Sequence, residues 1–196
     1  HLDFVDAVEE LADRIGLEVP RIKGKGQPND NQKKASLYDL MEKVSQYYAQ
    51  QLKTQIDAPV NDYIQQRGLS EQIIEEYGIG YSPDSWDRIL NLLKKETNSQ
   101  NTLLETGLII QPDDKSRLYD RFRDRLMFPI RDRRGRTIGF GGRILSNDKN
   151  QAKYLNSPET PLFHKGSELY GFFEMTRAMR KIERILVVEG YMDVVA

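Results

Sequence analysis

The feature that most constrains this fold is a change in the spacing of apolar residues near Leu108. Before it, apolar residues recur every three or four positions, which places them on one face of an α-helix. After it, apolar and polar residues tend to alternate, which is typical of a half-buried β-strand. We therefore predict an α+β chain in which a layer of helices is followed by an antiparallel β region.

Four helices are predicted between residues 36 and 95. The longest begins at Ser36 and carries an apolar face made of Leu37, Leu40, Met41, Val44, Tyr48 and Leu52. Shorter helices are predicted over residues 59–66, 70–77 and 85–95, because Gly, Ser or Pro bounds each of them.

Residues 1–35 have a different character. A short amphipathic helix is predicted over residues 3–15, and residues 17–35 are rich in Gly, Lys and Asn with little that could be buried. Such a composition is typical of a flexible linker. Because an isolated short helix is marginally stable in water, we expect residues 1–35 to be the end of an upstream domain and its linker.

The β half centres on two predicted strands, residues 126–131 and 137–143, joined by a turn that contains Gly135. Three glycines interrupt the second strand. Glycine inside a strand marks either a bulge or a surface that a ligand approaches closely, and both alternatives stay open at this point. Arg143 follows directly, so its side chain and the open backbone could serve the same ligand.

Positive charge is concentrated in the β half. The net charge of the chain is −1, but residues 115–143 hold ten Lys or Arg against three Asp. Downstream, Lys153, Tyr154 and Asn156 lie in a short predicted extended segment that Pro158 ends. A lysine beside an aromatic ring and an amide suits a phosphate backbone with stacked bases, so this pattern favours nucleic acid as the ligand.

A candidate acidic site follows an apolar run near the end of the sequence. Residues 185–188 predict a buried strand of parallel type, with Glu189 at its carboxyl end, a turn at Gly190 and a helix after it. Ligands of open α/β sheets bind at the carboxyl ends of strands, which makes Glu189 a candidate catalytic acid. Asp193 is either a favourable carboxylate at the start of the helix or a second ligand, with Glu189, of a hard cation such as Mg²⁺.

Other features exclude whole classes of protein. The absence of Cys excludes a disulfide framework and a Cys-ligated zinc site, and it fits a reducing cytosol. No apolar run approaches the roughly 18 residues of a membrane span. The two histidines, His1 and His164, predict no metal site, and Lys165 before a predicted helix over residues 167–181 is either a phosphate contact or a solvated side chain.

Four blocks of the sequence resemble, in order, the signature motifs of bacterial DNA primases of the DnaG type. They are DRFRDRLMFPIRDRRGRTIGFGGRIL, KYLNSPET, FHKGSELYG and LVVEGYMDVVA, with a weaker resemblance upstream through QQRGLS, IGYSP and Trp86–Asp87. The resemblance implies residues 36–181 as the N-terminal subdomain of the primase core and residues 182–196 as the first β-α element of a toprim-like α/β domain. It also implies a nucleotidyltransferase, a DNA-directed RNA polymerase that makes short RNA primers for replication. This chain alone would be a catalytically incomplete part of that enzyme.

The resemblance further implies roles for individual side chains. Glu189 resembles the toprim glutamate that binds metal or acts as acid or base, and Asp193 resembles a nearby acid of the same site. Seven residues resemble template- and nucleotide-contacting groups of the primase surface: Arg67, Arg123, Arg143, Lys153, Tyr154, Asn156 and Lys165. From its position alone, at a corner between two predicted helices, Arg67 also fits a solvated surface residue.

The cofactor implied by the resemblance is Mg²⁺ or Mn²⁺, at a site that this sequence only begins, whereas zinc is expected only in an upstream domain. The implied partners are a single-stranded DNA template, ribonucleoside triphosphates and, through a further C-terminal domain, the replicative helicase. We expect a cytoplasmic monomer without membrane contact.

Two alternatives stay open at this stage. Another toprim enzyme, such as a nuclease or topoisomerase, would share Glu189 and Asp193 but gives no reason for the KYLNSPET and FHKG blocks. A non-catalytic module that binds single-stranded DNA would share the basic segment but has no use for Glu189 at the end of a strand.

Overall fold

The structure, a computed structural model, describes residues 12, 30–55, 59–114, 117–146, 151–179 and 181–195. The chain divides into two compact units, residues 1–30 and 31–196, and the fold below is that of the second. The predicted helix over residues 3–15, apart from Ala12, and most of the predicted linker lie outside the described residues. In the described ranges, no helix is long and apolar enough to cross a membrane.

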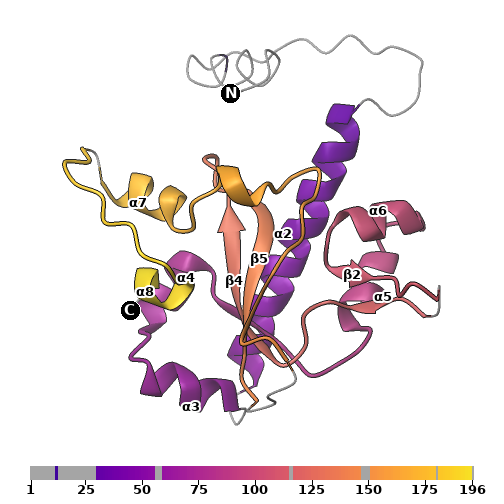
Figure 1. Cartoon of the computed structure of the whole chain (residues 1–196), viewed down its shortest axis with the longest axis horizontal. Coiled ribbons are helices and arrows are strands. Elements are labelled where there is room, and N and C mark those ends of the chain that lie inside the picture. The colour runs from indigo at the N-terminus through magenta and orange to yellow at the C-terminus, as the bar shows by residue number, and fades with distance from the viewer. Residues whose placement is uncertain are drawn as a thin grey trace. The chain divides into compact units, whose positions relative to one another are not determined.

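Helices dominate the first half of this unit, as predicted (Figure 1). They are α2 (Asp30–Thr54), α3 (Pro59–Gln66), α4 (Glu71–Tyr77), α5 (Arg88–Lys94) and α6 (Gln100–Glu105). The predicted start of α2 at Ser36 is wrong, because residues 30–35 of the expected linker are already helical. Lys and Ala in this stretch favour a helix.

The strands form two antiparallel sheets. The larger has the order β1 (Gly80–Ser82), β4 (Arg125–Arg131), β5 (Thr137–Ile144) and β6 (Tyr154–Asn156), and β2 (Ile109–Ile110) pairs with β3 (Tyr119–Asp120) in the smaller. The predicted hairpin is confirmed as β4 and β5, and Gly135 takes the left-handed conformation of its turn at φ 81°.

The core lies on both faces of β4, which is buried along most of its length. On one face, Val44 and Tyr48 of α2 pack with Met127 and Phe140, and the rings of Tyr48 and Phe140 meet edge to face at 5.4 Å. On the other face, side chains of α3, β1 and α8 (Tyr191–Val195) pack around Phe128. The apolar faces of the helices and strands are therefore buried in a sheet that lies between two helical layers.

Two buried charged residues hold the loops around this core. Asp120 on β3 accepts hydrogen bonds from the backbone N–H groups of Ile89 (2.8 Å) and Leu90 (2.9 Å), and so supplies the N-terminal cap of α5 from about thirty residues away. Arg125 donates to the carbonyl oxygens of Gly142 (3.1 Å) and Ala152 (3.0 Å), which ties the segment before β6 to β5. Neither role was predicted from the sequence.

The glycines of β5 make room for aromatic side chains. A register shift opposite Ile130 and Arg131 leaves an extra residue in β5 beside Gly139, so the bulge alternative is met there. At Gly141, a Cβ atom would lie 2.3 Å from the ring of Tyr191. The close approach that the sequence indicated at this position is therefore made by a side chain of the same chain.

The C-terminal part departs most from prediction. Lys165–Ser167 form a 3₁₀ turn and α7 (Phe172–Ala178) begins only after Gly171, whose φ of 80° interrupts a continuous helix, so the predicted helix over residues 167–181 is wrong in its bounds. The predicted buried strand over residues 185–188 is also wrong: these residues form no strand, and Leu186 is 85% exposed. No strand among the described residues pairs with them, so their backbone joins no ladder.

Candidate nucleic-acid interface

Two neighbouring strands bring the predicted template residues together. β6 pairs antiparallel with β5, so that Tyr154 lies opposite Arg143 and Asn156 lies opposite Gly141. Residues two apart on a strand point to the same face, and Phe140 of β5 faces α2. Arg143, Tyr154 and Asn156 therefore share the face of the sheet that α2 does not cover.

Arg143 is the centre of a cluster of aromatic rings. Its guanidinium carbon lies 4.4 Å from the centroid of the Tyr63 ring and 5.7 Å from that of Tyr154. One terminal nitrogen of Arg143 donates to the carbonyl oxygen of Ile144 at 2.8 Å, and its buried Nε has no hydrogen-bond partner among the described residues. Burial raises the pKa of Tyr154, so its ring stays neutral beside the cation. In proteins that bind single-stranded nucleic acids, aromatic rings and arginine are the side chains on which bases stack.

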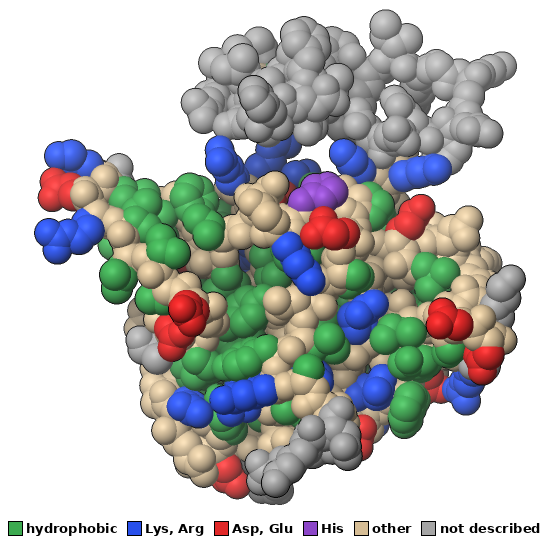
Figure 2. Space-filling view, viewed as in Figure 1, with side chains coloured by type: hydrophobic (Ala, Val, Ile, Leu, Met, Phe, Trp, Pro, Cys, Tyr) green, Lys and Arg blue, Asp and Glu red, His purple; other side chains and the backbone are tan. Residues whose placement is uncertain are grey.

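Two further members of the cluster come from α3 and from the residue that follows it. Arg67 lies just beyond the end of α3, with its guanidinium carbon 5.3 Å from the centroid of the Tyr63 ring, so Arg67 and Arg143 both lie over this ring. Tyr63 was not predicted from the sequence, although its position four residues before Arg67 matches that of neighbours on a helix face. Figure 2 shows Lys and Arg side chains interspersed with hydrophobic ones across this view of the molecule.

Tyr191 joins this cluster to residues 189–193, here called the acidic turn because they contain Glu189 and Asp193. Its hydroxyl donates to Oδ1 of Asn156 at 2.9 Å, and its ring lies 6.3 Å from that of Tyr154. Glu189 and Asp193 flank it in the sequence. The sequence analysis gave Tyr191 no role, because the contact spans thirty-five residues.

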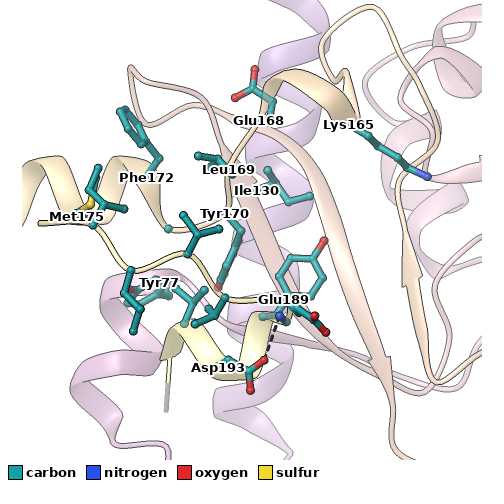
Figure 3. Close-up of a pocket in the computed structure, with 18 of the residues that line it drawn as sticks. Tyr77, Ile130, Lys165, Glu168, Leu169, Tyr170, Phe172, Met175, Glu189 and Asp193 are labelled. Atoms are coloured by element: carbon teal, nitrogen blue, oxygen red, sulfur yellow. Dashed lines mark hydrogen bonds between the residues drawn. The ribbon is translucent and has the colours of Figure 1, made fainter.

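A cavity of about 540 Å³ opens next to this junction, and its lining includes Asn156, Lys165, Glu189 and Asp193 (Figure 3). Figure 3 shows the carboxylates of Glu189 and Asp193 at the same end of the cavity. Oδ2 of Asp193 accepts a hydrogen bond from the backbone N–H of Gly190 at 3.1 Å. Glu189 and Asp193 are exposed, so both can reach a ligand in the cavity.

Three of the predicted site residues lie at the margin of this arrangement or outside it. The exposed Lys153 directly precedes β6. The backbone N–H of Lys165 donates to Oε1 of Glu159 at 3.0 Å. Arg123 belongs to a second group, with its guanidinium carbon 4.1 Å from the ring of Trp86 and 5.3 Å from that of Tyr119, and no described contact joins that group to Arg143.

The acidic turn offers two carboxylates, those of Glu189 and Asp193, as possible ligands of a metal ion. Among the described residues, no group of three or more His, Asp or Glu side chains gathers as metal ligands. Two carboxylates suit Mg²⁺, which keeps several waters and commonly takes one or two carboxylates together with phosphate oxygens of a substrate. The donor set therefore fits a metal held jointly by protein and nucleotide.

Comparisons with known proteins agree on one family. A family model described as the N-terminal domain of the DNA primase catalytic core matches residues 47–176. The chain is 48% identical over 198 residues to a DNA primase of Pseudomonas putida, which covers 100% of this chain and 30% of that protein. It is 45% identical over 196 residues to a DNA primase of Escherichia coli K12, covering 100% and 33% respectively. The chain thus spans about a third of the length of these curated relatives.

A solved structure supports the fold. The structure described as a DnaG primase catalytic domain bound to single-stranded DNA superposes with a TM-score of 0.76 at 45% identity, and the match covers 83% of this chain and 50% of that one. The predicted α+β fold is confirmed by this match.

Proposed function

Because the chain belongs to the family of N-terminal domains of the DNA primase catalytic core, we propose that it is part of a primase that synthesises short RNA primers on single-stranded DNA. The resemblance to DnaG-type primases is confirmed by this membership and by DNA primases that match the whole chain. The nuclease, topoisomerase and binding-module alternatives gain no support from any comparison.

The observation that carries the proposal is the cluster around Arg143. Two arginines from different elements converge on Tyr63, and Tyr154 on the neighbouring strand adds a second ring. Cations that track a phosphate backbone and rings that stack on bases bind single strands with little dependence on sequence, which is what a template track requires. A protein 45% identical to this chain has been solved with single-stranded DNA bound, which supports the same ligand here.

Primer synthesis joins nucleotides by attack of a 3′-hydroxyl on an α-phosphate, with departure of pyrophosphate. Glu189 and Asp193 would hold a divalent cation, Mg²⁺ or Mn²⁺, which when bound supplies charge that stabilises the attacking and leaving oxygens. Lys165, on the lining of the same cavity, would meet the triphosphate of an incoming ribonucleotide. Lys153 and Asn156 at β6 and Arg123 beside Trp86 would contact the template.

The remaining assignments complete this proposal. Residues 36–181 would form the N-terminal subdomain of the core, and residues 182–196 would begin its toprim domain, after an upstream segment over residues 1–35. Further carboxylates of the metal site, a zinc-binding domain and the contact with a replicative helicase would come from the rest of a complete primase. Such an enzyme would act as a monomer in the cytoplasm.

The test is binding of a labelled single-stranded oligonucleotide, followed by fluorescence anisotropy across a salt series. We expect Arg143→Gln to weaken binding and to reduce the slope of log K against log salt by about one. Arg134→Gln is the matched control, because it removes the same charge from an exposed position of the β4–β5 turn. Absence of salt-dependent binding, or equal losses in the two variants, would refute the template assignment.

A second assay addresses catalysis. A complete primase that contains this sequence should form RNA primers from ribonucleotides when Mg²⁺ is added, and Glu189→Gln should abolish that synthesis. Primer synthesis that survives this change would remove Glu189 from the proposed site.

A further inference from the structure

We infer that Tyr191 is a positioning residue that fixes the side-chain amide of Asn156. It thereby couples β6, the β-strand proposed to contact the DNA template, to the acidic turn. The inference rests on the proposed function, since it assigns how two parts of that site are held together. It is carried by the contacts of the ring, the hydroxyl hydrogen bond and the position of Tyr191 between two carboxylates.

The ring of Tyr191 is held on three sides. It stacks on Phe128 at 5.3 Å with an angle of 12° between the planes, and it meets Tyr170 edge to face at 4.8 Å. On the third side it occupies the space above Gly141, where no Cβ atom could fit. A ring confined in this way has its hydroxyl fixed at one point above the edge of the sheet.

That point is the carbonyl oxygen of the Asn156 side chain, which accepts from the Tyr191 hydroxyl at 2.9 Å. The hydroxyl is the donor in this bond, because the oxygen of an amide can only accept. With its oxygen engaged, the amide presents its two N–H donors on the opposite side. Asn156 is exposed, and these donors suit phosphate or base acceptors of a strand that follows β6.

The same ring anchors the acidic turn. Tyr191 is the first residue of α8, Asp193 follows in that helix, and Glu189 lies two residues before it. Residues 185–188 ahead of Glu189 are exposed and join no strand, so they do not fix the turn on that side. The Tyr191 ring and hydroxyl tie this turn to β5 and β6, and Met192 of the same helix is buried in the core cluster that contains Phe128.

The experiment compares two Tyr→Phe changes in neighbouring rings. Tyr191→Phe removes the hydrogen bond to Asn156 and keeps the ring. Tyr170→Phe is the matched control, because its buried hydroxyl has no hydrogen-bond partner among the described residues. We expect Tyr191→Phe to raise the Kd for a labelled single-stranded oligonucleotide roughly three- to tenfold, as the loss of one orienting hydrogen bond predicts, and Tyr170→Phe to change it less than twofold.

A double-mutant cycle separates positioning from general stability. If Tyr191 acts through Asn156, Tyr191→Phe should have no further effect on binding in the Asn156→Ala background. In the wild-type background, the side-chain amide resonance of Asn156 in NMR spectra should shift in Tyr191→Phe and stay in place in Tyr170→Phe.

The outcomes distinguish the coupling role of Tyr191 from the proposed function. Unchanged oligonucleotide binding by Tyr191→Phe would overturn the inference and leave the proposed function standing. So would an equal loss of affinity from Tyr191→Phe in the wild-type and Asn156→Ala backgrounds. Failure of the unaltered chain to bind the oligonucleotide would overturn both.

Discussion

Replacing Gly141 with Ala places a methyl group where the ring of Tyr191 lies. The added Cβ would be 2.3 Å from Cζ, 2.5 Å from Cε2 and 2.7 Å from the hydroxyl oxygen of Tyr191, whereas ordinary contact begins near 3.4 Å. The ring would have to move by about 1 Å. Phe128 stacks on the ring at 5.3 Å, and Tyr170 meets it edge to face.

Two opposing effects decide the size of the change. Alanine in place of glycine in a strand stabilises by about 0.5–1 kcal/mol through the lower entropy of the unfolded chain. Against this, overpacking costs about 1–3 kcal/mol, and a ring that swings out loses a hydrogen bond of about 1 kcal/mol together with its aromatic contacts. The clash wins, and we expect Gly141→Ala to lower the free energy of unfolding by about 2 kcal/mol, which corresponds to a fall in Tm of roughly 4–8 °C.

Urea denaturation followed by far-ultraviolet circular dichroism measures this change. The same substitution made in the Tyr191→Ala background should cost nothing, because the ring that it displaces is no longer present. Gly166→Ala is the control, since a Cβ there would meet no atom within 4 Å, and it should change the free energy of unfolding by less than about 0.5 kcal/mol.

An equal cost of Gly141→Ala in the presence and absence of Tyr191 would refute the predicted clash. A stabilising effect of Gly141→Ala would refute it too, because the lower entropy of the unfolded chain would then outweigh the contact. The first result would show that the cost does not come from the Tyr191 ring, and the second that the ring can move away from β5.

Two further predictions concern side chains outside the interface. Asp120→Ala removes the carboxylate that caps α5 and should lower the free energy of unfolding by about 1–2 kcal/mol. The burial that raises the pKa of Asp120 also offsets part of the stabilisation from its hydrogen bonds. An unchanged midpoint of urea denaturation would contradict the capping role. The backbone N–H of Lys165 and the side chain of His164 hold the pKa of Glu159 below its usual value of 4.5. Because the folded-state pKa is depressed, the stabilisation is present above the unfolded-state pKa and is lost as the pH falls through the folded-state pKa. NMR should show that the protection of the Lys165 backbone amide from hydrogen exchange falls in the unaltered chain as the pH is lowered through that range. Glu159→Gln is the matched control, and its Lys165 amide should have a protection that does not depend on pH.

The elements predicted best are those whose signals are local. α3 has the predicted bounds, and α4 begins after Ser70, whose hydroxyl accepts from the N–H of Ile73, and ends at Gly78 with a φ of 63°. The β4–β5 hairpin needed only alternating side chains and a turn glycine. Each of these choices involves residues a few positions apart, so the sequence contains the whole argument.

The candidate interface could be predicted only in part. The sequence pointed to Arg143, Tyr154 and Asn156 through charge and residue type, and the structure places them on one face of the sheet. It could not supply Tyr63 or Tyr191, because their contacts to that face come from helices that are distant in sequence. Residue type suggests a ligand, and only the packing of remote elements decides which side chains meet it.

Residues 185–188 mark the limit of the pattern most clearly. Four apolar residues in a row show a segment that is able to be buried in a sheet, but burial requires a neighbouring strand, which the described residues do not provide. Gly141 is the opposite case, since a residue that weakens a strand by itself is required once Tyr191 packs on it. The sequence by itself determined the local elements and the chemistry of the side chains; the tertiary structure decided their partners, because burial and contact are properties of pairs of segments.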